Sequence, residues 1–431
     1  MADQALYFRA FSEATGFELY SLSPASSKPT LIDINPGMGS SFPGGFAALH
    51  GQLYFTAETD ENGLELYRLE QGTTKPFLID VNQGAGNSGP ADLTAFNDQL
   101  YFIAATEQNG TELYRLDPRS TQPVLIDINL GVASSIPSHL TASENGLYLT
   151  AQTEEHGCEL YWLAADSTAP TLIDINPGPA SSFPGSFTGF IEFDGQLYFS
   201  AFAQGTGTEL YRLTLGSTAP TLIDISPGLA STFETNFTGF AVFGEQLYFA
   251  ATTEGAGTEL FRLAPGSSPQ GLLDINPGPA GSRPGNFAVI QDQLYFTAAT
   301  EAHGMELYRL AGSNSHPTLI EIGPGMGSAS PQDLTVFQDT LYFRAMTVEH
   351  GAELYLLSPD STEPILLDIN PGMKDALPSD FTGFNAQLYF TAATEATGYE
   401  PYVLSSDRSF ATSIEINRGP ESSFPSEYFV L

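Results

Sequence analysis

Short apolar runs separated by turn residues make up the whole sequence. In one representative stretch the runs are 187–193, 197–201, 209–213 and 221–225, rich in Tyr, Phe, Ile, Leu and Thr. Gly, Pro, Asn, Asp and Ser fill the gaps, as expected of strands joined by turns. No apolar stripe with a 3.6-residue period has useful length, so we expect an all-β chain with almost no helix.

This four-strand pattern recurs nine times. Leu-Tyr-Phe or Leu-Tyr-Leu begins at positions 47 or 50 residues apart, namely 6, 53, 100, 147, 197, 247, 294, 341 and 388. Four strands in a repeat of about 40–50 residues indicate a β-propeller blade. We therefore predict that residues 1–431 form one domain, a nine-bladed β-propeller of four-stranded antiparallel blades. Nine exceeds the usual four to eight blades, so two smaller rings are the structural alternative.

The two ends of the sequence complement one another. The chain opens at the second strand of a repeat, Leu6-Tyr7-Phe8, and residues 424–431 align with a first strand. If the C-terminal strand completes the N-terminal blade, neither end leaves an unpaired sheet edge. We expect the ring to close in this way, one strand plus three.

Composition and charge narrow the choice of partner. Hydrophobic residues make up 42% of the chain, and 50 acids against 14 bases give a net charge of −36. We expect no nucleic-acid partner, because binding nucleic acid needs clustered Lys and Arg. We expect no membrane insertion, because the sequence has no run of about 18 apolar residues. A glycan, a cation or a basic protein is the compatible partner. No signal peptide is visible, which leaves the cytoplasm or export by another route, and the single Cys158 is expected to be a small packed side chain.

The repeats resemble the bacterial ELWxxDGT (hyalin-like) repeat proteins along the whole chain. The residues of one copy that carry the resemblance are Asp174, Asn176, Gly178, Ser181, Ser182, Pro184, Phe187, Thr188, Leu197, Tyr198, Phe199, Gly207, Glu209, Leu210 and Tyr211. Two features depart from that family: its Trp is Tyr or Phe here, and segments such as 217–220 replace its Asp-Gly-Thr turn. The resemblance implies a propeller-like protein, often at the cell surface, without an established catalytic site.

Repeated acids are expected on one face, called the top, which holds the loops between second and third strands and the crossovers to the next blade. Every third strand contains a Glu, namely Glu18, Glu65, Glu112, Glu159, Glu209, Glu259, Glu306, Glu353 and Glu400. Every fourth strand contains an acid, usually with Asn two residues on and Gly four residues on; the Asp residues among these acids are Asp33, Asp80, Asp127, Asp174, Asp224, Asp274 and Asp368. The acids either accept hydrogen bonds that fix turns, or the Asp residues supply oxygen ligands to calcium.

Glycan recognition is the leading functional prediction. Top-face clefts between blades would combine aromatic platforms with planar polar groups, from Phe42, Phe183, Phe233, Phe424, Asn35, Asn129, Asn176 and Asn276. Gly89, Ile136, Arg283, Ala329 and Leu377 are assigned to the same position as these Phe residues in the other repeats. Either only some clefts bind, or the Phe residues merely pack.

No enzyme motif is present, since the sequence lacks a P-loop, an HExxH pattern and an ordered Ser-His-Asp set. We therefore predict a non-catalytic, multivalent binding module, with a structural or protein-interaction scaffold as the alternative. Arg68, Arg115, Arg212, Arg262 and Arg309 are expected to pair with acids on neighbouring strands. The two longer repeats are expected to extend the bottom hairpins near residues 193–195 and 243–245.

Overall fold

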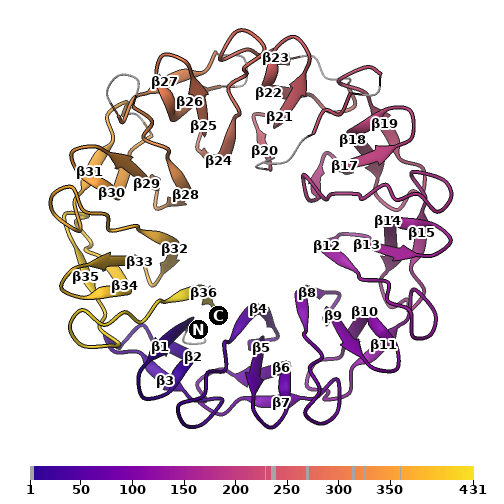
Figure 1. The fold of residues 1–431 in the computed structure, drawn as a ribbon, viewed down its shortest axis with the longest axis horizontal. Helices are drawn as coiled ribbons and strands as arrows, with labels where there is room; N and C mark the ends of the chain where they lie inside the picture. Colours follow the sequence, from indigo (N-terminus) through magenta and orange to yellow (C-terminus); the bar gives the residue numbers. More distant parts are fainter. Residues whose placement is uncertain are drawn as a thin grey trace.

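The chain forms a ring of nine four-stranded antiparallel sheets around an open channel (Figure 1). This computed structural model describes residues 4–228, 230–233, 239–267, 271–312, 316–323, 327–359 and 361–431, and no helix occurs among them. In that part of the chain there is accordingly no helix able to cross a membrane. The predicted all-β, nine-bladed propeller is confirmed.

Each blade contributes one strand to each of four concentric layers. The innermost strands, from blade 1 to blade 9, are β36 (Ser426–Val430), β4 (Gly44–Leu49), β8 (Ala91–Phe96), β12 (Ser138–Ser143), β16 (Ile191–Phe193), β20 (Phe240–Phe243), β24 (Gly285–Ile290), β28 (Gln332–Phe337) and β32 (Ser379–Phe384). The second strands are β1 (Leu6–Ser12), β5 (Gln52–Thr59), β9 (Gln99–Thr106), β13 (Gly146–Thr153), β17 (Gln196–Ala203), β21 (Gln246–Thr253), β25 (Gln293–Thr300), β29 (Thr340–Thr347) and β33 (Gln387–Thr394).

The third strands are β2 (Gly16–Leu22), β6 (Gly63–Glu70), β10 (Gly110–Leu116), β14 (Gly157–Ala164), β18 (Gly207–Thr214), β22 (Gly257–Leu263), β26 (Gly304–Ala311), β30 (Gly351–Leu357) and β34 (Gly398–Leu404). The outer strands are only three residues long: β3 (Thr30–Ile32), β7 (Phe77–Ile79), β11 (Val124–Ile126), β15 (Thr171–Ile173), β19 (Thr221–Ile223), β23 (Gly271–Leu273), β27 (Thr318–Ile320), β31 (Ile365–Leu367) and β35 (Ala411–Ser413). Such short edge strands offer little template for unwanted strand pairing.

The C-terminal strand closes the ring as predicted. β36 pairs antiparallel with β1, and Leu6 lies opposite Val430 in this ladder. Beyond it, Ala5 N–H donates to the Leu431 carbonyl at 2.9 Å, and Leu431 N–H donates back to the Ala5 carbonyl at 3.0 Å. We call the boundary between blade 9 and blade 1, which this strand completes, the seam.

The hydrophobic core lies between blades rather than inside one of them. At the boundary between blades 2 and 3, for example, Tyr54 and Leu66 pack against Leu100 and Phe102, and all four are fully buried. Because each blade is covered on both faces, the central strands are continuous apolar runs rather than alternating ones. This explains why Leu-Tyr-Phe, or Leu-Tyr-Leu in blade 4, marks every repeat.

The strand-three arginines connect neighbouring blades through backbone carbonyls. Arg68 donates to the Ser120 carbonyl of blade 3 at 3.4 Å, and Arg212 donates to the Ser267 carbonyl of blade 6 at 3.4 Å. Arg309 reaches blade 8 in the same way. The expectation that these three arginines pair with acids on neighbouring strands is therefore wrong, because the side chain points to the adjacent blade's hairpin.

The extra residues of the two longer repeats do not lengthen the bottom hairpins. In blade 5, Phe193 pairs with Gln196, and in blade 6, Phe243 pairs with Gln246, the same two-residue turn that Leu49 and Gln52 make in blade 2. In blade 5 the extra length instead precedes a shortened inner strand, at residues 185–190. In blade 6 it precedes β20, where residues 234–238 lie outside the described part of the chain.

Candidate functional site

A buried glutamate in each third strand holds the crossover to the next blade. In blade 1, Ile34 N–H donates to Glu18 Oε2 at 2.8 Å. Ser41 donates to the same carboxylate twice, through N–H at 3.1 Å and Oγ at 2.7 Å. All nine of these glutamates are fully buried. Their hydrogen bonds favour the turn-fixing interpretation of the strand-three acids, because little of the carboxylate remains for a ligand.

Burial also changes the acidity of these glutamates. Desolvation raises the pKa of Glu18, Glu159, Glu353 and Glu400 to about 7, from an ordinary value of 4.5. Hydrogen bonds from the backbone and, in most blades, from a hydroxyl act in the opposite direction, and the acid after each fourth strand raises the pKa further. Desolvation dominates because the side chains are shielded from water.

The seven candidate calcium ligands lie singly, each directly after the outer strand of a different blade. Asp80 Oδ2 accepts a hydrogen bond from Gly84 N–H at 3.3 Å, and Asp127 Oδ2 accepts one from Gly131 N–H at 3.2 Å. These bonds close the turn that follows the strand. Nowhere in the described part of the chain do three or more His, Cys, Asp or Glu side chains gather in a metal-binding arrangement. Calcium binding by these carboxylates stays a prediction.

Three histidines on the top face contact carboxylates of their own blades. His156 Nδ1 lies 3.4 Å from Asp174, His350 Nδ1 lies 3.5 Å from Asp368, and His303 Nδ1 lies 3.3 Å from Glu321. Each of these histidines thus has a carboxylate partner within its own blade.

The candidate asparagines use their side chains to close the crossover turns. The Nδ2 atom of Asn129 donates to the Ser134 carbonyl at 3.2 Å, and that of Asn276 donates to the Gly281 carbonyl at 2.9 Å. Asn35 makes a longer contact of this kind with Ser40. Asn176 donates to the Ala180 carbonyl at 3.2 Å and also accepts a hydrogen bond from Gln204 N–H of the next blade. These amides position the crossovers.

The four candidate phenylalanines divide into two groups. Phe42, Phe183 and Phe424 are about half exposed, whereas Phe233 is 2% exposed and packs against Phe249. Phe233 is therefore not available as a platform for a ligand. Its ring belongs to the core between blades 5 and 6.

The three exposed rings stand at a strained backbone position. In eight blades the residue at this point of the crossover has φ between 43° and 53°, including 44° at Phe42, 47° at Phe183 and 44° at Phe424. This left-handed conformation is unusual for a bulky residue. On the crossover from blade 7 to blade 8 this position is held by Ser330. The sequence-based assignment of Ala329 to this position is therefore wrong by one residue.

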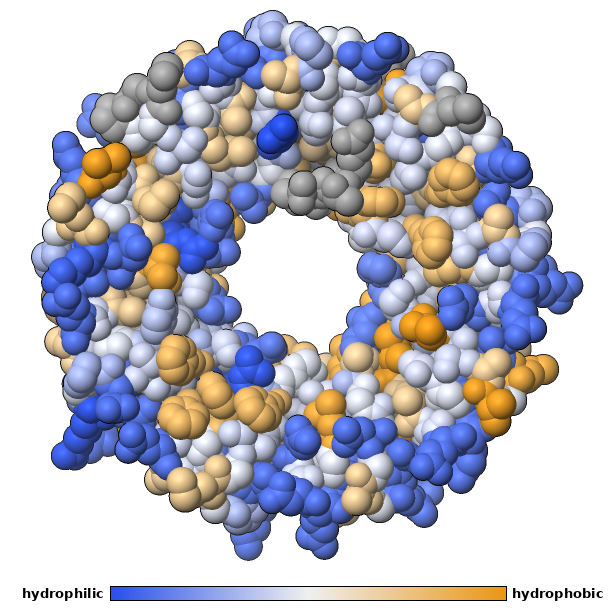
Figure 2. All heavy atoms as spheres, viewed as in Figure 1, coloured by the Kyte–Doolittle hydropathy of each residue, from blue (hydrophilic) through white to orange (hydrophobic). Residues whose placement is uncertain are grey.

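Three further aromatic residues extend two of these rings into two aromatic groups, one on each side of the seam. Tyr399 stacks on Phe424 with ring centroids 5.6 Å apart. Phe11 lies 5.2 Å from Phe17, which stacks on Phe42 at 5.3 Å. The two halves meet where Phe11 N–H donates to the Ser423 carbonyl, beside Phe424, at 2.6 Å. We call these five residues the aromatic strip, and Figure 2 shows apolar side chains gathered over this part of the ring.

A polar groove adjoins the aromatic strip at the seam. It has a volume of about 1070 Å³ and lies between the outer edge of blade 9 and the β1–β2 hairpin of blade 1. Its polar wall includes Glu13, Lys28, Asn417, Arg418 and Glu421. The Nδ2 atom of Asn417 donates to the Phe11 carbonyl at 3.1 Å, which ties the groove to the strip.

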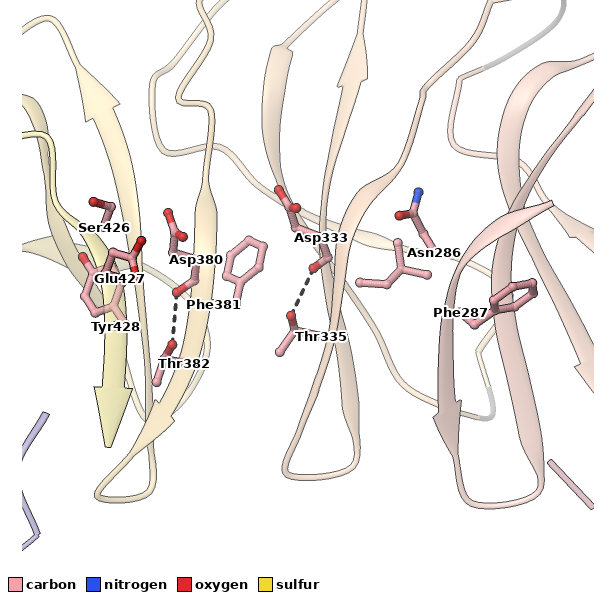
Figure 3. Close-up of a pocket in the computed structure, with 11 residues that line it drawn as sticks. Asn286, Phe287, Asp333, Thr335, Asp380, Phe381, Thr382, Ser426, Glu427 and Tyr428 are labelled. Carbon is pink, nitrogen blue, oxygen red and sulfur yellow. Dashed lines mark hydrogen bonds between the residues drawn. The ribbon is translucent and has the colours of Figure 1, made fainter. Parts of the chain in front are cut away.

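A second hollow of about 690 Å³ lies on the channel wall, between the inner strands β24, β28, β32 and β36 (Figure 3). Asn286, Asp333, Asp380 and Glu427 take equivalent places on these strands, each with φ between 50° and 60° at a bulge, and all four line the hollow. Burial and the charges of Asp333 and Glu427 raise the pKa of Asp380. The hollow offers acceptors to a cation or to hydroxyl groups.

Comparison with known proteins identifies no family for this chain. No protein-family model matches the sequence, and no curated protein matches it, so the ELWxxDGT resemblance is not confirmed. Apo AztD from Citrobacter koseri is a solved structure of similar fold, with 11% identity, coverage of 99% of this chain and 98% of that chain, and a TM-score of 0.45. A prolyl endopeptidase has 12% identity, 83% and 53% coverage, and a TM-score of 0.44. TolB from Acinetobacter baumannii has 12% identity, 64% coverage of both chains, and a TM-score of 0.31.

The protein thus belongs structurally to the nine-bladed β-propellers. It spans about half the length of the peptidases that it matches. At these identities and TM-scores the likeness carries no argument about activity, so function has to be inferred from the site itself.

Proposed function

We propose that this propeller is a non-catalytic recognition module that binds glycan chains at the seam. The observation that carries the proposal is the aromatic strip. Five aromatic side chains from two blades and their crossovers form two groups that meet at one backbone hydrogen bond across the seam, and Phe42 and Phe424 are about half exposed. The faces of sugar rings are apolar and stack on such surfaces, as other amphipathic ligands do.

The groove beside the strip supplies the polar half of a sugar site. Carboxylate and ammonium groups such as Glu13 and Lys28 can accept from and donate to sugar hydroxyls. A net charge of −36 favours neutral chains over anionic ones. The strip extends over more than one blade, which suits an extended oligosaccharide better than a single sugar.

The remaining chemistry of the chain is consistent with binding rather than catalysis. The strand-three glutamates are occupied by the crossovers that they hold. Burial raises the pKa of the Cys158 thiol to about 11, which keeps it protonated at neutral pH and a poor nucleophile. We therefore assign no catalytic role to either group.

The proposal is tested by a glycan array, followed by titration calorimetry with the oligosaccharides that bind, in calcium and in a chelator. We expect neutral chains to bind, and Phe42→Ser and Phe424→Ser each to weaken binding at least tenfold. Leu377→Ser is the matched control, because it changes the same crossover position where no aromatic strip lies. Loss of glycan binding in the chelator would show that the site requires calcium.

A blank array, or hits that survive both Phe substitutions, would contradict the proposal. In the first case a stable protein complex in a pull-down would favour the alternative of a scaffold for a basic protein. The negative charge of the ring fits a basic protein, but no surface described above favours a basic protein over a glycan as the ligand.

A further inference from the structure

We infer that the ring has a second glycan cleft, at the boundary between blades 4 and 5, and that it binds bivalently. The inference rests on the proposed function, because it assigns the same ligand class to a second place. Its residues are Phe183, on the crossover leaving blade 4, and Phe202, near the top of β17 in blade 5. Both are exposed, at 52% and 38% of their surface.

The geometry of this cleft matches that of the seam. Phe202 N–H donates to the Ser182 carbonyl at 2.7 Å, just as Phe11 N–H donates to the Ser423 carbonyl at 2.6 Å. In each case the next residue on the crossover is a Phe in the left-handed conformation, with φ of 47° at Phe183 and 44° at Phe424. At both boundaries, therefore, one Phe donates the inter-blade hydrogen bond and another Phe directly follows the residue that accepts it.

Aromatic residues on both sides occur at these two boundaries alone. The same backbone hydrogen bond recurs at all nine boundaries, and every residue of it is described. At the seven other boundaries the facing residues are Phe42–Glu58, Gly89–Ala105, Ile136–Gln152, Phe233–Thr252, Arg283–Ala299, Ser330–Met346 and Leu377–Ala393. The ring fold does not require a pair of Phe here, because most boundaries form without one.

Polar groups also correspond between the two clefts. Asn176 bridges to blade 5 by accepting from Gln204 N–H at 3.2 Å, and its equivalent Asn417 bridges to blade 1 by donating to the Phe11 carbonyl. Gln204 itself takes the place that Glu13 has at the seam. The blade 4–5 cleft lacks aromatic counterparts of Phe17 and Tyr399, since Thr208 and Cys158 stand at those positions. We expect it to be the weaker of the two.

The two clefts lie almost opposite one another on the top face. Four blades separate them in one direction and five in the other, across the channel (Figure 1). A ring that holds two separate sites on one face is suited to a polymer or a glycan-coated surface, where the second binding event becomes intramolecular. Such coupling increases apparent affinity by about 10²–10⁴-fold without any new contact.

The test compares variants that each lose one cleft. One carries Phe183→Ser and Phe202→Ser, the other Phe11→Ser and Phe424→Ser, and Ile136→Ser is the control. The probes are cellohexaose, xylohexaose and chitohexaose in calorimetry, and the corresponding polysaccharides immobilised on a sensor surface. Phe→Leu versions of both pairs, which keep an apolar side chain but remove the aromatic face, guard against misfolding.

We expect the wild type to bind two molecules of one hexasaccharide and each variant to bind one. On the polysaccharide surface, either variant should dissociate at least about tenfold faster than the wild type, as loss of bivalency requires. One site in the wild type, with no change from the blade 4–5 substitutions, would overturn this inference and leave the seam proposal intact. No binding of any hexasaccharide or polysaccharide would overturn both.

Discussion

The indole of Trp162 occupies the space that a side chain at Gly146 would need. A Cβ atom built at Gly146 would clash with the indole Nε1 of Trp162, and it would also lie 2.6 Å from the backbone carbonyl oxygen of Leu163. In blade 2 the corresponding residues are Arg68 and Gln52, and the Gln52 side chain accepts a hydrogen bond from Tyr54. Blade 4 therefore differs at two positions that compensate for one another, a large side chain beside a residue without one.

This compensation predicts a double-mutant cycle. Gly146→Gln alone should destabilise the protein by about 1–3 kcal/mol, the usual range for overpacking. Gly146→Gln together with Trp162→Arg recreates the combination of blade 2 and should recover the part of that loss that the indole causes, whereas the contact with the Leu163 carbonyl remains. Urea unfolding followed by circular dichroism measures all four proteins of the cycle. Equal losses in the single Gly146 variant and the double variant would contradict the compensation.

The buried glutamates predict an unequal response to two substitutions at one crossover. Glu112 accepts from Ile128 N–H, Ser135 N–H and Ser135 Oγ, at 2.9, 2.6 and 2.6 Å. Glu112→Gln places an NH₂ group where donors already point, so we expect a loss of about 1–3 kcal/mol for an unsatisfied buried group.

Ser135→Ala is the matched control for that variant. It removes the hydroxyl and keeps both backbone donors, for an expected loss of about 0.5–1.5 kcal/mol. Blades 7 and 8 already carry Ala329 and Ala376 at this place, and their crossovers have the same backbone bonds. A Ser135→Ala loss as large as that of Glu112→Gln would show that the hydroxyl, not the carboxylate, holds the crossover.

The ring and its closure could be predicted from the sequence because each repeat carries the same buried Leu-Tyr-Phe strand. Its spacing fixed the number of blades, and the alignment of residues 424–431 with a first strand identified the partner of β1. The extra residues of blade 5 were misplaced for a physical reason. Three extra residues anywhere between Pro184 and Phe193 lengthen the repeat equally, so the repeat spacing alone does not locate them.

The candidate site was harder to predict because it depends on residues far apart in the chain. Phe11 and Phe424 meet only through ring closure, and Phe42 and Phe233 occupy one position in the repeat but differ in burial. A signal was nevertheless present. Comparing equivalent positions across the nine repeats would have shown Phe only at 11 and 202 in one column, and aromatic residues only at 17 and 399 in another.

The raised pKa values predict that stability falls as pH rises. The pKa of Glu18, Glu159, Glu353 and Glu400 is about 7 in the folded protein and near 4.5 when unfolded. Between these values the folded state binds more protons than the unfolded state, so the contribution to stability is complete below about pH 4.5 and is lost by about pH 7.

Thermal unfolding between pH 5 and pH 8 tests this. The net charge of −36 acts in the same direction through repulsion between surface charges, but salt screens exposed charges far more than buried ones. We expect the midpoint to be higher at pH 5 than at pH 8 in 1 M NaCl as well as at low salt. A difference that disappears in salt would assign the effect to the surface rather than to the buried glutamates.

Ring closure predicts that removing β36 exposes a reactive edge. The strand pairs with β1 along one side, and its Tyr428 and Phe429 rings lie 5.3 Å from Phe8 and 6.0 Å from Phe46. Without residues 426–431, the inner edge of β1 has no partner and these apolar contacts are lost, so we expect a lower unfolding midpoint together with concentration-dependent association. Light scattering and calorimetry measure the two effects, and a synthetic peptide of residues 424–431 added in trans should reverse both.

Arg9→Ala is the control, since it removes the Arg9–Ser426 hydrogen bond and leaves the strand in place. A truncated protein that stays monomeric with an unchanged midpoint would show that the eight other blades hold the ring without this closure.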